Sequence, residues 1–366
     1  MKRRDFISGI AGATAVTAMS ACSKDETQAV LGGSVPMETV NWKMVTTWPK
    51  NFPGLGTGAN RVAELINEMS GGRIKVKVYG AGELVGAFEV FDSVSRGTAQ
   101  LGHAGAYYWK GKIPSAVFFS SVPFGLTATE MNAWLYSGGG LELWEEAYKP
   151  FGLIPNPAGN TGTQMGGWFN KEINAIADLK GLKMRIPGLG GAVLKKAGGL
   201  PITLPGGEIF PSLQSGALDA TEWVGPYNDL AFGLYKAAKY YYTPGWHEPG
   251  STMECMINEE AFNLLTPDLQ SIVRNAMKVA NLEMLSEYTA RNQQALQTLI
   301  EKHKVQLKHF PDEVLSELKK LSAEVVEEEA AKNALSAKVW ASQKTFRDQV
   351  SKWTNVSENA FVKSRG

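Results

Sequence analysis

Arg185 is the side chain of this sequence best placed to bind a carboxylate. It lies in the segment Leu182–Ile186, whose composition and alternation predict a short strand, and a Pro-Gly pair follows directly. A guanidinium offers two parallel N–H donors to a carboxylate, and a helix predicted over Gly191–Ala197 would add the partial positive charge of its N-terminus. The spacing favours an anion site but leaves open an ordinary surface ion pair.

A second candidate is the pair Glu222 and Trp223, which lies near the end of a strand predicted over Ala220–Val224. A Gly-Pro turn follows the strand. Proteins of the α/β class bind ligands beyond the carboxyl ends of their strands, so an acid and an aromatic ring at this position suit a small polar ligand. A packed tryptophan beside a solvated glutamate is the alternative.

The segment Gly54–Ala59 matches the glycine pattern of a dinucleotide-binding turn. It follows a predicted strand and precedes a predicted helix, as that motif requires. However, Pro49 and Pro53 separate the strand from the glycines, and no acid follows the next strand, Ile74–Val78, where one would bind a ribose. The sequence therefore favours a flexible loop beside a cleft over a nucleotide site.

Motifs of zinc enzymes and of serine hydrolases are absent from the sequence. It contains four histidines but no His-x-x-x-His pair, no cysteine pair at metal-binding spacing and no Gly-x-Ser-x-Gly motif. None of the histidines is assigned to a site. The spacing does not exclude a hydrolase triad, but nothing in the sequence points to one.

The composition is that of a folded protein with two or three domains. The chain has 366 residues, of which 44% are hydrophobic and 20% charged. Its 37 Lys and Arg against 36 Asp and Glu give a net charge of +1, without the basic excess typical of nucleic-acid-binding proteins. Two cysteines, Cys22 and Cys255, argue against a disulfide framework.

The N-terminus predicts an export signal over residues 1–22. Paired arginines precede a mildly apolar stretch that is too short to span a membrane, a pattern typical of the twin-arginine route. Small residues before Cys22 fit a lipoprotein cleavage site, and ordinary cleavage nearby fits as well. Residues 23–38 are polar and indicate a tether.

The mature chain predicts an α/β fold of two similar parts followed by helices. In the first part, strands and helices alternate over Val40–Thr46, Ala59–Met69, Ile74–Val78, Glu89–Arg96 and Gln100–Ala106. In the second, they alternate over Leu182–Ile186, Gly191–Ala197, Pro201–Leu204, Pro211–Ser215 and Ala220–Val224. This order predicts parallel or mixed sheets covered by helices. Asp268–Lys304 and Asp312–Trp353 are long, charged and helical in period, so we expect helices that brace two lobes or join two subunits.

Two segments resemble motifs of one protein family. Asp178–Pro187, which contains Arg185, is similar to the hallmark segment of the solute-binding proteins of tripartite ATP-independent periplasmic (TRAP) transporters, the DctP family. Glu208–Asp219 resembles the next motif of that family. The resemblance extends from about Val40 to about Lys363, and it implies a two-lobed periplasmic solute-binding protein that delivers its ligand to the membrane subunits of a transporter.

Within this family, Gln164–Phe169 and the Glu-Trp pair resemble the branch that binds 2-oxo acids and related monocarboxylates such as pyruvate or lactate. The resemblance implies that Arg185 holds the carboxylate. It also implies that a metal ion is held by the side chains of Gln164 and Glu222 and by the backbone carbonyl of Trp223, so that Gln164 and Trp223 also border the ligand. The same resemblance assigns Glu248 to the ligand shell and Tyr107 and Tyr108 to an aromatic wall.

Electrostatics supports a cation in such a site. A Glu222 carboxylate about 4 Å from an anionic ligand would be repelled by roughly 4 kcal/mol at an effective dielectric constant near 20. Arg185 cannot neutralise both charges, and Glu248 adds a third. A protonated glutamate, a bridging cation or a hydroxyl-bearing ligand would each resolve the repulsion. Amide, carboxylate and carbonyl oxygens favour Na⁺ or Ca²⁺ over Zn²⁺.

The sequence thus predicts a non-enzymatic, periplasmic solute-binding component of a TRAP transporter, which captures a small monocarboxylate as a metal-bridged complex in a cleft. Trp168, Trp223 and Trp246 are expected either to exclude water from the ligand or to pack in the core. After the signal and tether, the expected parts are lobe I over 39–160, lobe II over 161–249, a return to lobe I over 250–267, and C-terminal helices over 268–366.

Two alternatives remain at this stage. An exported oxidoreductase would use the Gly54–Ala59 segment for a cofactor loaded before twin-arginine export. A ligand-sensing partner of a membrane receptor would use the same cleft as a transport protein. The sequence leaves open which carboxylate and which cation bind, whether Cys22 is lipidated, and whether a homodimer forms through the C-terminal helices.

Overall fold

The computed structural model describes residues 39–366. The predicted export signal, the tether and the lipidation of Cys22 all lie outside this range. Between residues 39 and 366, no helix combines the length and the apolar character needed to cross a membrane.

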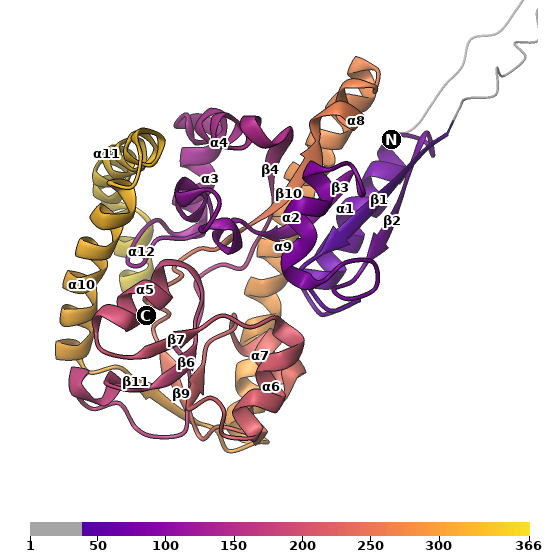
Figure 1. The fold of residues 1–366 in the computed structure, drawn as a ribbon. Coiled ribbons are helices and arrows are strands. Elements are labelled where there is room, and N and C mark those ends of the chain that lie inside the picture. The colour runs from indigo at the N-terminus through magenta and orange to yellow at the C-terminus, as the bar shows by residue number, and fades with distance from the viewer. Residues whose placement is uncertain (1–38) are drawn as a thin grey trace, which may run out of the picture. The chain divides into compact units, whose positions relative to one another are not determined.

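The first sheet has five strands in the order β2-β1-β3-β10-β4 (Figure 1). Its central strands β1 and β3 are parallel and β10 is antiparallel to both of its neighbours, so the sheet is mixed, as the sequence predicts. The strands are β1 (Val40–Thr46), β2 (Ile74–Tyr79), β3 (Leu101–Gly105), β4 (Leu153–Asn160) and β10 (Thr252–Asn258).

The second sheet has six strands in the order β11-β9-β5-β8-β6-β7. The strands are β5 (Gly167–Phe169), β6 (Lys183–Arg185), β7 (Leu200–Ile202), β8 (Ala220–Thr221), β9 (Tyr240–Thr243) and β11 (Gln306–His309). Strand β11 interrupts the C-terminal region that the sequence predicts as helical, and it pairs parallel to β9 at the sheet edge. Its four residues are largely exposed, so they lack the apolar pattern from which a strand can be predicted.

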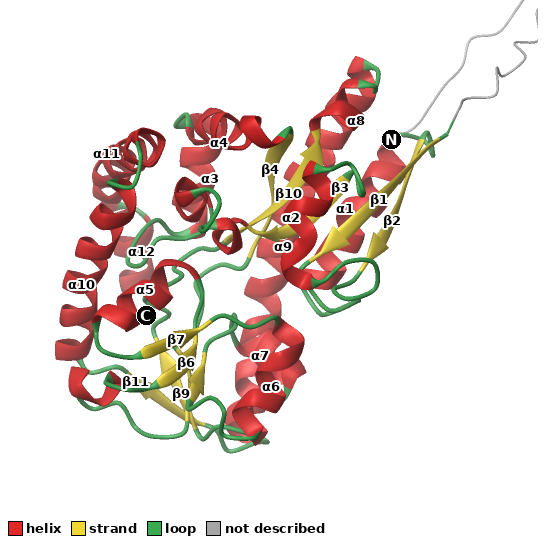
Figure 2. Ribbon diagram, viewed as in Figure 1, coloured by secondary structure: helices red, strands yellow, loops and turns green. Residues whose placement is uncertain are grey.

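Helices surround both sheets (Figure 2). They are α1 (Leu55–Met69), α2 (Val90–Ser95), α3 (Ala128–Ser137), α4 (Gly140–Tyr148), α5 (Gly188–Lys196), α6 (Gly206–Gln214), α7 (Pro226–Phe232), α8 (Glu259–Asn263), α9 (Pro267–Glu301), α10 (Asp312–Ala330), α11 (Ala334–Val356) and α12 (Glu358–Arg365). The helical region predicted over 312–353 is therefore two helices, and the side chain of Asn333 caps the second by accepting from the Ser336 N–H.

The glycine-rich segment 54–59 is not a flexible loop, so that interpretation was wrong. Leu55 already begins α1, and Gly58 packs so closely against the end of Met284 in α9 that an added Cβ would clash. Gly54 has a φ of 72° and lies against the ring of Tyr288, where a Cβ would be 2.6 Å from the hydroxyl oxygen. Glycine is therefore needed at position 54, where α1 packs closely on Tyr288 of α9, whereas a side chain at position 58 would require Met284 to move.

The C-terminal helices contact elements from several parts of the chain. Helix α9 packs on β4, α1 and α7, while α10 packs on α5 and α11 packs on α3 and α4. The chain passes between the sheets at residues 161–166 and again at 244–251. These two segments lie together, because the N–H of Gln164 donates to the Glu248 carbonyl (3.1 Å) and that of Thr161 to the Ser251 carbonyl (3.0 Å).

The lobe boundaries stay predictions. The strands of predicted lobe I (39–160) and of the return segment (250–267) belong to the first sheet, and those of predicted lobe II (161–249) belong to the second.

Candidate carboxylate and cation site

The pairing of β6 with β8 brings Arg185 next to Glu222, although 37 residues separate them. In this parallel pair Arg185 lies opposite Thr221, and the backbone N–H of Glu222 donates to the Arg185 carbonyl at 3.1 Å. Both side chains are about 1% exposed. The two candidates that the sequence places at separate strand ends therefore form one buried site.

Four groups surround the Arg185 guanidinium. It forms an ion pair with the Glu222 carboxylate through Nη1 and donates to the Tyr108 hydroxyl through Nη2 at 3.2 Å. Its Nε donates to the Leu204 carbonyl at 3.3 Å, and the ring of Trp223 lies 4.9 Å from its central carbon. Burial by itself would lower the pKa of Arg185, but the Glu222 charge holds it above its ordinary value.

Glu222, His247 and Glu248 form a compact, buried cluster. One potential ligand atom from each lies within 4.8 Å of the others, and no other such cluster of three occurs within residues 39–366. Oε2 of Glu222 is 3.3 Å from Nε2 of His247. The segment from 244 to 251, which crosses between the sheets, carries both His247 and Glu248 to the end of β8.

Gln164 lies beside this cluster with its amide oxygen unsatisfied. Its Nε2 donates to the Thr161 hydroxyl (3.1 Å) and to the Glu248 carboxylate (2.8 Å), so Oε1 is directed away from these two acceptors. That Oε1 is buried and has no hydrogen-bond partner. An unpaired buried acceptor is costly, so it needs a partner. An oxygen of this kind, with two nearby carboxylates, fits a hard cation such as Na⁺ or Ca²⁺.

The cluster carries more negative than positive charge when its acids are ionised. Two carboxylates, Glu222 and Glu248, face one guanidinium, Arg185. Burial, and next the Glu222 charge, raises the pKa of Glu248 to about 7, while the neighbouring His247 acts in the opposite direction. The excess negative charge therefore allows a cation to bind together with an anionic ligand.

Aromatic rings form one wall of the site. Tyr107 and Tyr108 lie in a short 3₁₀ helix after β3, and their rings meet edge to face at 4.6 Å. Tyr108 contacts Arg185, whereas Tyr107 packs against Gly188 at the start of α5. Burial raises the pKa of both tyrosines, so both stay neutral donors. Trp48, after β1, lies 6.3 Å from the Tyr108 ring and 6.2 Å from that of Trp223.

A cavity of about 430 Å³ opens on the other side of these tyrosines. It lies between the Tyr107–Lys110 segment and the residues around α5, including Ile186 and Pro187, which directly follow Arg185. Lys195 lines it as well, and so does Lys110, which is ion-paired with Glu329 at 3.1 Å.

The structure brings together most of the predicted site residues. Arg185, Gln164, Glu222, Trp223, Tyr108 and Glu248 all lie around the cluster, and Tyr107 supports Tyr108 from one residue away. Trp246 is buried beside His247 at 5.5 Å between ring centroids. Trp168, by contrast, stacks on Tyr241 at 4.1 Å within the core, so it is a packing residue.

Two residues near the site were missed. His247 follows no metal-binding spacing, and only its position next to Glu248 could have suggested it. Trp48 follows the carboxyl end of β1, so the rule that pointed to Glu222 could also have pointed to it. Its indole N–H donates to His103 Nδ1 at 2.8 Å.

Comparison with known proteins agrees with this geometry. The model of the DctP family, described as bacterial extracellular solute-binding protein, family 7, matches residues 44–333. A monocarboxylate 2-oxoacid-binding periplasmic protein of Nostoc sp. is 45% identical over 361 residues, which is 99% of this chain and 98% of the relative.

Solved structures with the same fold carry ligands and cations. A TRAP periplasmic solute-binding protein from Pseudoalteromonas atlantica with bound sodium and pyruvate is 43% identical and matches with a TM-score of 0.87 over 89% of this chain and 99% of its own. One from Colwellia psychrerythraea with calcium and pyruvate is 42% identical, with a TM-score of 0.86 and the same coverage. One from Bordetella bronchiseptica, a dimer with calcium and picolinate, is 37% identical, with a TM-score of 0.87 over 89% and 97% of the two chains.

Proposed function

This chain belongs to family 7 of the bacterial extracellular solute-binding proteins, and we propose that it captures a small 2-oxo monocarboxylate together with a cation. The family consists of solute receptors of transporters, so the chain is a binding protein and not an enzyme. The proposed ligand class includes pyruvate, and the proposed destination is the membrane subunits of a TRAP transporter.

The observation that carries the proposal is the buried, unpartnered amide oxygen of Gln164 beside the Arg185–Glu222 pair. A carboxylate-binding site without a cation would need the arginine and would leave this oxygen unused. Two similar solved structures support the same conclusion, since one has bound sodium and pyruvate and the other has bound calcium and pyruvate.

In the proposed complex, Arg185 binds the ligand carboxylate through its planar pair of donors. Gln164, Glu222 and the Trp223 carbonyl are the proposed cation ligands, with Glu248 next to them. A cation bound there would offset the negative charge of the carboxylates and would be coordinated by two oxygens of a 2-oxo acid. Tyr107, Tyr108 and the Trp223 ring would limit the size of the ligand and exclude water.

The direct ion pair between Arg185 and Glu222 implies that cation and carboxylate binding are coupled. While Glu222 holds the guanidinium, Arg185 is neutralised and attracts a second anion poorly. Coordination of a cation by Glu222 releases Arg185 for the ligand. By linkage, the ligand strengthens cation binding by the same factor.

A thermal-shift screen tests the proposal. Pyruvate and other three- to six-carbon 2-oxo or 2-hydroxy acids should raise Tm in the presence of calcium, and dicarboxylates should not. Arg185→Gln should abolish the shift, whereas Lys183→Gln, on the same strand, should keep it. A full shift in Arg185→Gln would rule out this site.

We further propose export by the twin-arginine route, with the mature protein in the periplasm, the location in the name of the Nostoc relative. Mutation of Arg3 and Arg4 to Lys should retain the precursor in the cytoplasm if that route is used. Labelling with palmitate would decide whether Cys22 carries a lipid. If export and palmitate labelling are both measured in fractionated cells, the export route and the lipidation of Cys22 are tested separately.

A homodimer through the C-terminal helices is also proposed. Four large apolar side chains there are at least half exposed: Trp353 (68%), Val356 (72%), Phe361 (62%) and Val362 (51%). Such a patch is typical of an interface, and the Bordetella bronchiseptica relative is described as a dimer. Light scattering should give twice the monomer mass, and Trp353→Glu with Phe361→Glu should give the monomer.

The oxidoreductase alternative finds no support, since the glycine segment that would bind a cofactor is the packed start of α1 and the family binds solutes. A receptor-linked sensor would use the same cleft; growth on the ligand after deletion of the gene would show whether uptake depends on this chain.

A further inference from the structure

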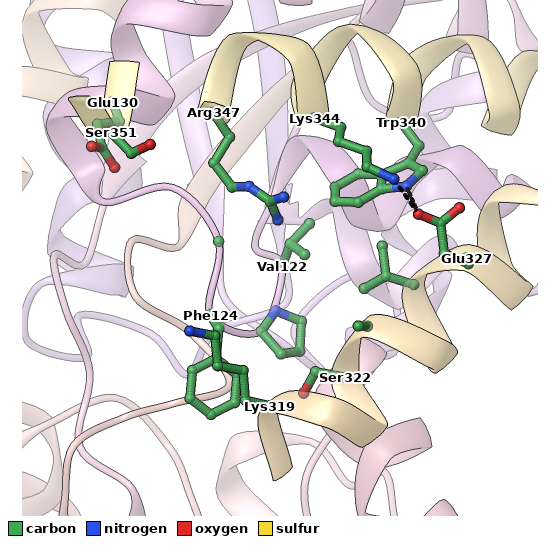
Figure 3. Close-up of a pocket in the computed structure, with 14 residues that line it drawn as sticks. Val122, Phe124, Glu130, Lys319, Ser322, Glu327, Trp340, Lys344, Arg347 and Ser351 are labelled. Carbon is green, nitrogen blue, oxygen red and sulfur yellow. Dashed lines mark hydrogen bonds and ion pairs between the residues drawn. The ribbon is translucent and has the colours of Figure 1, made fainter. Parts of the chain in front are cut away.

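A second cavity, of about 460 Å³, lies between α10, α11 and the loop Val122–Gly125 (Figure 3). Small-molecule sites are commonly about 300–1,000 Å³ in volume. Helix α3 adds Glu130 to the lining, and none of these elements contains a residue of the carboxylate and cation site. Val122, Phe124 and Trp340 supply apolar surface, and five charged side chains also belong to the lining.

Both acids of the cavity are already engaged. Glu327 accepts from Lys344 at 2.7 Å and from the Trp340 indole at 3.0 Å. Glu130 caps α3 by accepting the Thr127 N–H at 2.9 Å, and it also accepts the Thr354 hydroxyl at 2.6 Å. Glu327 is therefore already paired with a cation, whereas Glu130 is held by uncharged donors and keeps its negative charge.

Two cations of the cavity lack a strong partner. Lys319 has no ion pair within residues 39–366, and Arg347 pairs only with its neighbour Asp348 at 3.1 Å. Asp348 is 60% exposed, and a solvent-exposed pair of this kind contributes little. Figure 3 shows Arg347 extending from α11 toward Val122. With three cations and two acids in the lining, the cavity carries a positive charge surplus, which lies above an apolar floor.

The floor of this cavity is connected to the carboxylate and cation site. Phe124 has a φ of 54°, an uncommon conformation for an aromatic residue that usually persists where the surroundings enforce it. Its N–H donates to the Trp246 carbonyl at 2.8 Å, and its ring stacks on that of Trp246 at 6.0 Å. Trp246 directly precedes His247 and Glu248.

We propose that this cavity binds an organic anion with an apolar body, such as an aryl carboxylate or sulfonate. The anionic group lies against Lys319 and Arg347, and the body lies on Phe124 and Trp340. Occupancy braces Phe124, and through it the segment 246–248, in the arrangement that faces Glu222. The anion therefore strengthens ligand binding at the carboxylate and cation site, a consequence that rests on the proposed function.

A fluorescence titration with 1-anilinonaphthalene-8-sulfonate tests the cavity without pyruvate or metal. One probe should bind per chain, and the double variant Lys319→Gln, Arg347→Gln should bind it at least about tenfold more weakly, since both charge-assisted contacts to the sulfonate are lost. The control Lys320→Gln, Lys352→Gln removes the same charge from α10 and α11 outside the cavity and should bind normally. The uncharged N-phenyl-1-naphthylamine should bind poorly. Equal binding by the double variant and the wild type, or an equal loss in the control, would overturn the site.

A calorimetric titration with pyruvate, with and without the saturating probe, tests the coupling. The probe should tighten pyruvate binding about fivefold or more, the usual lower range of coupling between sites. An unchanged affinity would overturn the coupling. If pyruvate failed to bind at all, the proposed function would fail, while the probe titration would still decide whether the cavity is a site.

Discussion

Glu222→Gln should make carboxylate binding insensitive to cations. In the wild type, Glu222 neutralises Arg185 through a buried ion pair and is also the acid best placed to hold a cation. The amide keeps the size of the side chain but removes its charge. Arg185 is then free to bind an anion with or without metal, and the cation loses its main ligand.

The expected size of the effect follows from the geometry of the cluster. Potential ligand atoms of Glu222 and Glu248 lie within 4.8 Å of one another. Two unit charges at that separation interact by about 3.5 kcal/mol at an effective dielectric constant near 20. A ligand carboxylate at a similar distance from Glu222 meets the same repulsion, unless a cation offsets it. Chelation should therefore weaken pyruvate binding to the wild type by about 10- to 300-fold.

Isothermal titration of pyruvate, with excess calcium and again after chelation, measures this ratio. In Glu222→Gln the ratio should fall to below about threefold. The control Glu208→Gln changes the net charge equally at an exposed position on α6 and should behave like the wild type. The reasoning is refuted if Glu222→Gln remains as sensitive to chelation as the wild type.

Three further results are expected. Tyr108→Phe removes a hydroxyl that contacts the site arginine and should weaken pyruvate binding by about three- to tenfold, measured by titration; an unchanged affinity would contradict this. Burial raises the pKa of Glu254 from 4.5 to about 7, so the folded protein holds a proton that the unfolded chain releases between these values. The free energy of unfolding should accordingly fall by up to about 3 kcal/mol as the pH rises from 4.5 to 7 and then level off; urea unfolding of Glu254→Gln should show a reduced slope, and an identical slope would contradict this. Gly56→Ala should destabilise by about 1–3 kcal/mol, because its Cβ would lie 2.6 Å from the Pro49 carbonyl oxygen; Gly207→Ala, with open space around it, should not, and equal Tm values for the two variants would refute the packing argument.

The sequence predicted the strands and helices that have clear periodicity. Strand β1 has the predicted bounds, and β2, β3 and α9 lie within a few residues of theirs. The prediction failed where the local sequence pattern was weak or was compatible with more than one kind of secondary structure. Strand β11 is short, exposed and stabilised by pairing with β9, a contact that no local signal contains. The glycines of Gly54–Ala59 suggested a loop, whereas all but Gly54 lie within α1, where Gly58 packs against Met284 of α9.

The individual site residues could be predicted better than their arrangement. Arg185 and Glu222 each follow from the rule that ligands bind at strand ends. Their direct contact depends on the pairing of β6 with β8, and the position of Gln164 depends on two segments that cross between the sheets. His247 reaches Glu222 through that crossing alone, so spacing along the chain could not identify it.

A crystal structure grown with calcium and pyruvate would test the central claim most directly. The account predicts anomalous density for one cation bound by Gln164 Oε1 and Glu222, with the pyruvate carboxylate on Arg185 and the Arg185–Glu222 ion pair broken. Pyruvate bound elsewhere, or bound while that ion pair stays intact and Gln164 Oε1 stays without a cation, would contradict it.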